Sequence, residues 1–285
     1  MSDARPMDVT NRFVLDFALR FAAENGGVSP VGARVLDFGC GAGRLVQAGL
    51  ERGLNIKGAD VFYAGSTTRD DAAAAGLLDK SVFEILDGKI PFPDHRFDLV
   101  VNNQVMEHVE DLDAVLAEIH RVLAPGGTVL SLFPSRDVWR EGHIGIPFSH
   151  RLPKGSRLRF YYTWALRKLG LGTWKEQAPT CRQWAIDKLA WIDAFTVYRS
   201  RKAIFASYDR LFRNELREID YIRYRLVAKP GREWVLQVLR LPGMKALAQV
   251  VFRKLAFLVI VSRKATIAQK DAIAQKDPGS RKDRA

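Results

Sequence analysis

Apolar residues in the first half of the chain fall into short continuous runs that alternate with stretches of helical periodicity. The runs lie at 33–38, 56–61, 82–86, 97–102 and 128–133, and each has the length of a buried strand. Apolar residues at helical spacing mark 10–25, 45–52 and 109–123. Strands that are buried on both faces read as continuous apolar runs, and their alternation with helices is typical of a parallel, doubly wound sheet. The pattern therefore predicts an α/β fold.

The pattern changes after residue 136. We expect helices at 157–169 and 184–212, and two short helices within 233–254 that are broken at Pro242-Gly243. The stretch 216–227 is rich in β-formers and 255–261 is another apolar run, so we expect a strand in each. We therefore divide the chain into four parts: a core at 1–135, a helical cap at 136–215, a segment at 216–263 that completes the core, and a disordered polar tail at 264–285.

Charge is divided unevenly between the two halves. Residues 1–135 contain 12 Lys and Arg against 19 Asp and Glu, whereas residues 136–285 contain 32 against 13. The basic half would attract an anionic partner, and the acidic half would repel a polyanion. We therefore expect two different functional surfaces.

Cysteine content and the apolar runs bear on the compartment. Cys40 and Cys181 are the only two cysteines, which excludes a disulfide framework and favours a reducing compartment. The chain begins without a basic-then-apolar leader pattern, and the run Leu255–Val261 is far shorter than the roughly 20 residues of a spanning helix. We expect a cytoplasmic protein.

Candidate chemistry begins where the first apolar run enters a glycine-rich turn. The stretch 35–43 reads VLDFGCGAG, in which glycines allow a sharp turn and the following helix offers free N–H groups to a ligand. A dinucleotide-binding loop needs glycine at the sixth position, but Arg44 stands there. Asp37, two residues before the first glycine, suits a ligand with a cationic end, as S-adenosylmethionine has, better than a pyrophosphate.

Two further acidic residues follow the next two strands. Asp60 lies 21 residues after Gly39, where a carboxylate can accept hydrogen bonds from both ribose hydroxyls. Asp87-Gly88 follows the third strand, where the adenine would lie. The alternative is a cluster of turn glycines with capping aspartates, but acidic residues after three successive strands favour the cofactor site.

These motifs resemble those of the class I S-adenosylmethionine-dependent methyltransferases, and within them the ubiquinone- and menaquinone-biosynthesis group. The resemblance covers about residues 30–135 and rests on four stretches: VLDFGCGAG at 35–43, GAD at 58–60, LDGKIPFPDHRFDLVVNNQVMEHVED at 86–111, and EIHRVLAPGGTVLSLFP at 118–134. It implies a doubly wound, mostly parallel, seven-stranded Rossmann-like sheet with a reversed last pair, here carrying an inserted basic, aromatic-rich helical cap. The stretches 216–227 and 255–261 would be strands six and seven.

The resemblance also implies a cofactor site for S-adenosylmethionine. Asp37 would serve its methionine end, Asp60 its ribose and Asp87 its adenine, while residues 102–104 would line the cofactor and the mouth of the acceptor site. The expected cofactor-binding residues are Asp37, Gly39, Cys40, Gly41, Asp60, Val61, Asp87, Gly88, Asn103 and Gln104.

Two places could supply the residue that deprotonates a methyl acceptor. The first is Gln104 to His108, where some relatives bind a divalent metal through E-x-x-E-H. Here Gln104 replaces the first glutamate, and a neutral amide is a poor substitute for a charged ligand, so we expect no metal. His108 remains a candidate base, with the alternative that Glu107 and His108 only cap the next helix.

The second place is the loop at 139–150, after the fifth strand. It carries Glu141 and His143 near the carboxyl end of the sheet, where such folds bind substrates. We expect His143 to be the base because imidazole titrates near neutral pH. The catalytic candidates are His143, His108 and Glu141. The alternative is that His143 and His150 only bond loop backbone, and the spacing lacks a third metal ligand.

The acceptor is indicated only by the basic second half. Residues 151–168 interleave basic and aromatic side chains, as anion- or sugar-binding surfaces do. The apolar stripe in 233–255 is flanked by basic residues, so it either packs on the sheet or rests on an anionic membrane surface. Adenine- and glutamine-N-methylating relatives carry an N/D-P-P-Y/F signature after the fourth strand. Here that position reads Asn102-Asn103-Gln104-Val105, which argues against that subclass.

We therefore expect an enzyme that O-methylates a hydroxyl of a small molecule, glycan or glycolipid, with an anionic or lipid-linked acceptor and possible peripheral membrane contact. One alternative is an RNA methyltransferase, although the acidic cofactor half and the lack of an RNA-binding module make nucleic acid a poor partner. The other is a non-catalytic binding scaffold, which the intact set of glycines and aspartates disfavours.

Overall fold

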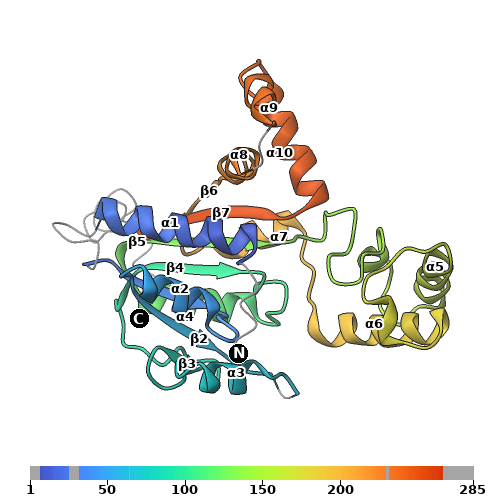
Figure 1. Cartoon of the computed structure of the whole chain (residues 1–285), viewed down its shortest axis with the longest axis horizontal. Helices are drawn as coiled ribbons and strands as arrows, with labels where there is room; N and C mark the ends of the chain where they lie inside the picture. The colour runs from blue at the N-terminus through green and yellow to red at the C-terminus, as the bar shows by residue number, and fades with distance from the viewer. Residues whose placement is uncertain (1–6, 26–31, 64, 229–230, 266–285) are drawn as a thin grey trace, which may run out of the picture.

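A computed structural model describes residues 7–25, 32–63, 65–228 and 231–265. Seven strands form one sheet in the order β3-β2-β1-β4-β5-β7-β6 (Figure 1). The strands are β1 (Arg34–Phe38), β2 (Asn55–Asp60), β3 (Val82–Glu84), β4 (Phe97–Asn103), β5 (Leu123–Phe133), β6 (Arg213–Leu216) and β7 (Leu258–Arg263). Strand β7 runs antiparallel to both β5 and β6, while β1 to β5 pair in parallel. The predicted fold class is confirmed.

Helices cover both faces of the sheet because successive strand residues point to opposite sides. Val35 and Val259 belong to the apolar cluster under α1 (Val9–Asn25), α2 (Arg44–Glu51) and α8 (Glu218–Val227). Their neighbours Leu36 and Ile260 belong to the cluster under α4 (Leu112–Val122) and α7 (Arg201–Tyr208). Helix α3 (Thr68–Ala74) precedes β3 at the edge of the sheet (Figure 1). The carboxyl ends of the parallel strands are thereby fixed on a rigid platform.

The predicted strand at 216–227 is wrong. Strand six is the short β6, and residues Glu218–Val227 form α8. Glu218 and Tyr221 are both fully buried, and Tyr224 is partly packed against the same core. This spacing of three residues is helical, and it outweighs the β-propensity of the isoleucines and tyrosines. Strand seven begins three residues later than predicted.

A separate helical cap stands beside the sheet (Figure 1). Its helices α5 (Arg157–Lys168) and α6 (Cys181–Phe195) enclose their own apolar cluster around Trp184 and Ile192. The predicted helix at 184–212 is interrupted at 196–200, after which α7 returns to the sheet. Ile204, Tyr208 and Phe212 pack in the apolar cluster of the sheet and not in that of the cap. The cap therefore ends before residue 215.

Two helices between β6 and β7 project away from the body (Figure 1). They are α9 (Glu233–Val238) and α10 (Met244–Leu255), as predicted for 233–254, and α10 has no buried residue. Among the described residues, no helix has both the length and the apolar character that a bilayer crossing requires. Most of the predicted tail, residues 266–285, lies outside the described residues, whereas Lys264 is buried beside β5.

Candidate active site

The glycine loop connects β1 to α2 at the carboxyl end of the sheet. Gly39 donates from its backbone N–H to the carbonyl oxygen of Ala59 at 2.8 Å. Its φ is +74°, and a Cβ there would lie 2.4 Å from a methyl group of Val105, a contact that no side chain tolerates. A Cβ at Gly41 would meet nothing closer than 3.9 Å. The loop therefore packs at its first glycine on the segment that follows β4, and it leaves space above its second glycine.

Asp60, at the end of β2, binds the backbone of this loop. One carboxylate oxygen accepts from the N–H of Gly41 at 2.7 Å, and the other accepts from the N–H of Phe62 at 3.0 Å. Each oxygen retains a second lone pair for a further donor. The same carboxylate can therefore fix the loop and accept a ligand hydroxyl.

Asp37 lies at the carboxyl end of β1 and is only 5% exposed. Burial, reinforced by the charge of Asp60, raises the pKa of Asp37 to about 7. Burial also raises the pKa of the Cys40 thiol far above its usual range, so this thiol stays neutral. A cation placed against Asp37 would stabilise its ionised form, and the structure thus fits a ligand with a positively charged end.

The remaining predicted cofactor residues lie along the same edge. Asp87 and Gly88 form an exposed turn with φ values of +51° and +70°, and Val61 is 43% exposed. Asn103 donates to the side chain of Asn11 at 2.9 Å, while its own buried carbonyl oxygen has no partner within the described part of the chain. Gln104 has φ +57° and donates from its N–H to Leu132. The glycine loop, Asp37, Asp60 and Asn103 thus meet at the carboxyl ends of β1, β2 and β4, as S-adenosylmethionine requires.

A second polar cluster follows β4 and centres on Glu107. This side chain is 1% exposed, and neither carboxylate oxygen has a hydrogen-bond partner among residues that the structure describes. Burial raises the pKa of Glu107 to about 8. An unpaired buried carboxyl group costs stability, so it indicates a function other than capping the next helix, which Asp111 caps instead.

Glu141 and His143 complete this cluster from the loop after β5. The Nδ1 atom of His143 lies 2.7 Å from a carboxylate oxygen of Glu141, which also accepts from the hydroxyl of Tyr198. Burial alone would raise the pKa of Glu141, but these hydrogen bonds and one from the Ile144 N–H hold it below its usual value. Burial opposes protonation of His143, yet the pKa of His143 is raised because Glu141 outweighs that penalty.

His108 lies directly beside His143. Its Nδ1 atom is 2.6 Å from the carbonyl oxygen of Phe195, and the two imidazole centroids are 5.1 Å apart, with Trp191 packed against both rings. Burial lowers the pKa of His108. Because each Nδ1 is engaged, the Nε2 atoms of both histidines remain for a substrate or an ion. His150, in contrast, contacts the carbonyl of Arg136, which is a structural role.

The structure supplies a third donor that the spacing of the motif lacks. Donor atoms of Glu107, His108 and His143 all lie within 4.8 Å of one another, although His143 is far from the other two in sequence. Two histidines and a carboxylate can hold a divalent metal, and hydrogen bonds from Nδ1 to a carboxylate and a carbonyl commonly orient such ligands. The spacing of residues 139–150 did not indicate this third donor, and the absence of a metal stays a prediction.

Two residues that sequence reasoning missed connect the parts of the site. Tyr198 fixes Glu141, and no motif marked it. Tyr63, just after β2, packs edge-on against Phe195 with centroids 6.1 Å apart. Burial raises the pKa of Tyr63, and the charges of Asp60 and Glu107 raise it further. Tyr63 therefore lies within electrostatic reach of both the cofactor carboxylate and the Glu107 cluster.

Comparison with known proteins identifies the class of the sheet half. Residues 36–131 match the family described as "Methyltransferase domain". This stretch of the chain is thus similar to a methyltransferase domain, which agrees with the family resemblance of its motifs. The match ends before the cap and before the loop that carries Glu141 and His143.

Two curated relatives and a solved structure illustrate the similarity. Norajmaline N-methyltransferase of Rauvolfia serpentina is 34% identical over 42% of this chain and 42% of its own length. A ubiquinone biosynthesis O-methyltransferase of Brucella melitensis biotype 2 is 30% identical over 44% and 52%. A solved S-adenosylmethionine-dependent methyltransferase from Mesorhizobium loti has a TM-score of 0.49 and 21% identity, covering 88% of this chain and all of that one. The chain thus spans about half the length of these curated relatives.

Proposed function

We propose that the protein transfers a methyl group from S-adenosylmethionine to a hydroxyl of a small-molecule, glycan or glycolipid acceptor. The observation that carries the proposal is the Glu141–His143 pair, which lies beside the buried Glu107 next to the cofactor edge of the sheet. A hydroxyl must lose its proton during methylation, whereas an amine that is already neutral needs no strong base. A histidine held by a buried carboxylate suits the first reaction.

The cofactor roles follow the order of the strands. Asp37 faces the amino end of the methionine moiety, Asp60 accepts the ribose hydroxyls, and the turn at Asp87-Gly88 borders the adenine. The open space above Gly41 and the unpaired oxygen of Asn103 support this placement. S-adenosylmethionine supplies an activated methyl group on a sulfonium, so the protein's remaining task is alignment and proton removal.

Proton removal falls to His143. Its Nδ1 proton is held by Glu141, which leaves Nε2 with the lone pair that accepts the hydroxyl proton. Glu141 then stabilises the imidazolium, and Tyr198 keeps the carboxylate in place. Trp191, packed on both imidazoles, excludes water from one side. The Glu141–His143–Tyr198 network thus acts as a preorganised proton acceptor.

The acceptor is proposed to be anionic because basic residues line the cap. Part of this charge is structural, since Arg159 pairs with Asp193 and Lys154 binds two backbone carbonyls. Arg157 and Lys168 remain exposed on α5, and Lys168 lies 4.0 Å from the ring of Trp164. A charged wall with an aromatic surface suits a phosphorylated or glycosylated acceptor.

The test is methyl transfer from tritiated S-adenosylmethionine to a panel of glycans, glycolipids and quinone precursors with free hydroxyls. We expect His143→Asn to lower the rate by about 10²- to 10⁴-fold, with cofactor binding by calorimetry unchanged. The control is His120→Asn on α4, away from the cluster, which keeps the rate. Methylation of amines alone, unaffected by His143→Asn, would refute hydroxyl transfer.

A divalent cation at the Glu107–His108–His143 cluster is a second candidate mechanism, favoured by the two unpaired oxygens of Glu107. A bound cation would lower the pKa of the acceptor hydroxyl and give His143 the role of a ligand. Chelation with EDTA separates the two mechanisms. It leaves the rate unchanged if His143 is the base, and abolishes it, with recovery on adding Mg²⁺ or Zn²⁺, if a metal is required.

A further inference from the structure

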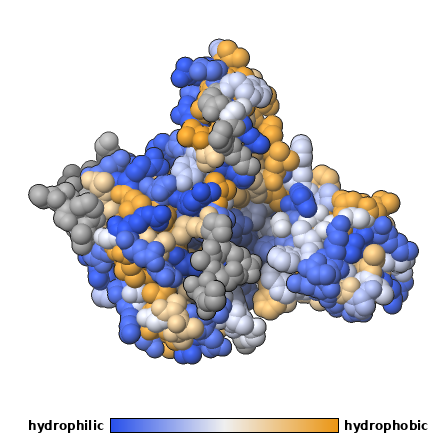
Figure 2. All heavy atoms as spheres, viewed as in Figure 1, coloured by the Kyte–Doolittle hydropathy of each residue, from blue (hydrophilic) through white to orange (hydrophobic). Residues whose placement is uncertain are grey.

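The projecting pair α9–α10 leaves apolar side chains in water. Together with the last residue of α8 these are more than two-fifths exposed: Val227, Trp234, Leu241, Leu247, Val250, Val251 and Leu255. Figure 2 shows apolar residues along this projection. Helix α10 has twelve residues and none of them is buried. Packing of this stripe on the sheet, the commoner expectation for such a pattern, does not occur.

The stripe on α10 is continuous along one face. Leu247, Val250, Val251 and Leu255 follow helical spacing, while the opposite side of the helix faces α8, where Arg253 binds the buried Glu218 at 2.7 Å. The ion pair fixes the orientation of α10 and keeps its apolar face outward. Contiguous exposed apolar surface of this kind marks an interaction site.

The charge around the stripe is strongly basic. Residues 231–255 contain five Lys and Arg and one acidic residue. Arg232, Arg240 and Lys245 are exposed, and none of the three has an ion-pair partner in the described part of the protein. A face that combines apolar residues, a tryptophan and positive charge matches the interfacial zone of an anionic bilayer. Two copies of this chain would instead bring like charges together.

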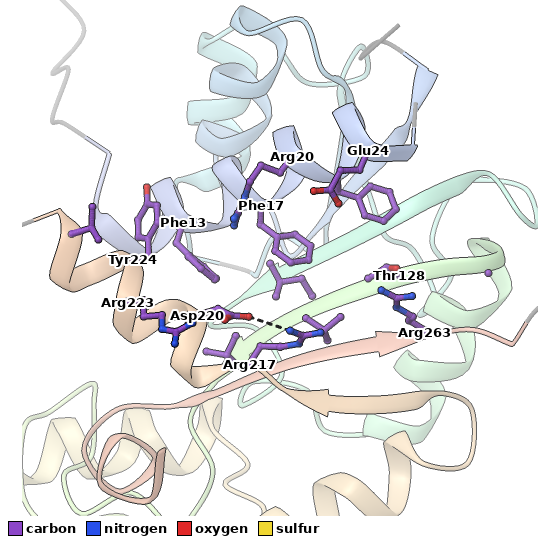
Figure 3. Close-up of a pocket in the computed structure, with 16 residues that line it drawn as sticks. Phe13, Phe17, Arg20, Glu24, Thr128, Arg217, Asp220, Arg223, Tyr224 and Arg263 are labelled. Atoms are coloured by element: carbon purple, nitrogen blue, oxygen red, sulfur yellow. Dashed lines mark hydrogen bonds and ion pairs between the residues drawn. The ribbon is translucent and has the colours of Figure 1, made fainter. Parts of the chain in front are cut away.

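A groove continues this surface toward the sheet. It lies between α1 and α8, encloses about 600 Å³, and has an apolar floor that includes Phe13, Phe17 and Val259. Figure 3 shows Arg20, Arg223 and Arg263 among the side chains around it, with Glu24 and the Arg217–Asp220 ion pair on the same walls.

The groove is connected to the projecting helices. Arg217, Asp220 and Arg223 also line a second hollow that reaches Lys245 and Gln249 on α10. The groove and the arginines beside it therefore reach the side of α10 that faces α8, while the apolar stripe lies on the other side of that helix.

We propose that the apolar stripe on α10, with Trp234 and the basic residues around it, binds an anionic phospholipid membrane. Trp234 and the stripe enter the boundary between headgroups and acyl chains, and Arg232, Arg240 and Lys245 meet the phosphates. This surface is formed by elements outside the proposed catalytic cluster. Membrane binding and methyl transfer are thus separable properties of the chain.

The test is cosedimentation of the full chain with vesicles of phosphatidylcholine alone or mixed with phosphatidylglycerol. We expect binding only to the mixed vesicles, with loss at high salt. The double variant Leu247→Asp/Val251→Asp should lose it, and Arg240→Glu/Lys245→Glu should weaken it by at least about fivefold for each charge changed. The control Leu158→Asp/Leu169→Asp alters two leucines of the cap that are more exposed than Leu247 and Val251, and it should bind normally.

Folding and self-association are checked on the same samples. Thermal unfolding of the α10 variants should match the parent because α10 has no buried residue. Equal binding to neutral and anionic vesicles, retained binding in Leu247→Asp/Val251→Asp, or loss in the cap control would overturn the proposal. So would absence of vesicle binding together with a dimer, seen by light scattering, that the α10 variant dissociates. That result would assign the face to a second copy.

Discussion

We predict that Asp37 makes cofactor affinity depend on pH in a range where an ordinary aspartate would not. Its carboxyl group is buried next to Asp60, and the pKa of Asp37 is about 7. Lowering the pH below 7 protonates it in the free protein. The proposed contact with the ammonium group of S-adenosylmethionine requires the ionised form, so binding must then release a proton.

The magnitude follows from the protonated fraction. With a pKa of about 7, the apparent dissociation constant rises by roughly an order of magnitude from about pH 7 to about pH 5.5, or about 1–2 kcal/mol. An aspartate at the usual pKa near 4 would change affinity by only a few per cent over this range. The amino group of the ligand stays largely charged throughout, since α-amino groups titrate near 8.

Calorimetry in buffers of different ionisation enthalpy provides the assay, because it reports affinity and released protons together. We expect up to one proton released at about pH 5.5 to 6. Asp37→Asn should bind weakly and without this pH dependence, whereas Asp70→Asn, on the exposed side of α3, should behave as the parent does. A flat affinity profile for the parent protein would refute the reasoning.

Three further predictions concern stability. Gly39→Ala should lower the free energy of unfolding by about 1–3 kcal/mol, because the new Cβ is strained at φ +74° and clashes with Val105. Gly41→Ala should lower it by only about 1 kcal/mol, because its Cβ would meet no atom closer than 3.9 Å. Chemical denaturation measures both values, and equal losses would contradict the difference in packing. Asp37→Asn should raise the free energy of unfolding of the free protein by about 2–4 kcal/mol at about pH 8 and leave it unchanged near pH 4. The reason is that the raised pKa of Asp37 makes the parent protein less stable as pH rises toward 7. Chemical denaturation at the two pH values measures the gain, and an equal gain at both would contradict the prediction. Trp184→Ala should lower the free energy of unfolding by about 3–5 kcal/mol, since the ring is fully buried in the cap and its N–H donates to the carbonyl of Thr173 at 3.0 Å. A loss below about 1 kcal/mol in thermal unfolding would show that the cap core is not required for stability.

The sequence predicted the sheet half well because its signals are local. Four of the five apolar runs coincide with strands to within two residues, whereas β5 begins at Leu123, five residues before the run at 128–133. The turn at 39–43 contains glycine at each position with positive φ. The prediction of a strand at 216–227 is wrong because the isoleucines and tyrosines of this stretch favour strands. Only tertiary contacts decide that Glu218 and Tyr221 are buried together on a helix.

The polar cluster was predicted in pieces. His143, Glu141 and His108 were each candidates, but sequence spacing could not bring the loop after β5 next to Glu107. That proximity depends on the path of the chain through the cap and back to the sheet, which also delivers Tyr198. Long-range contacts of this kind leave no periodic signal, so the proximity of the three donor side chains is seen only in the structure.

The cap enters and leaves the sheet through the two connections that carry Glu141, His143 and Tyr198, whereas the glycine loop and its aspartates belong to the sheet. The residues proposed to select and deprotonate the acceptor and those proposed to bind the cofactor are therefore encoded in different stretches of the gene. If the proposed function holds, mutations that lengthen, shorten or change the side chains of the cap should alter acceptor preference and leave the methyl-donor site intact. In directed evolution, libraries confined to residues 151–195, which leave out Glu141, His143 and Tyr198, should sample acceptor preference at little cost to S-adenosylmethionine binding.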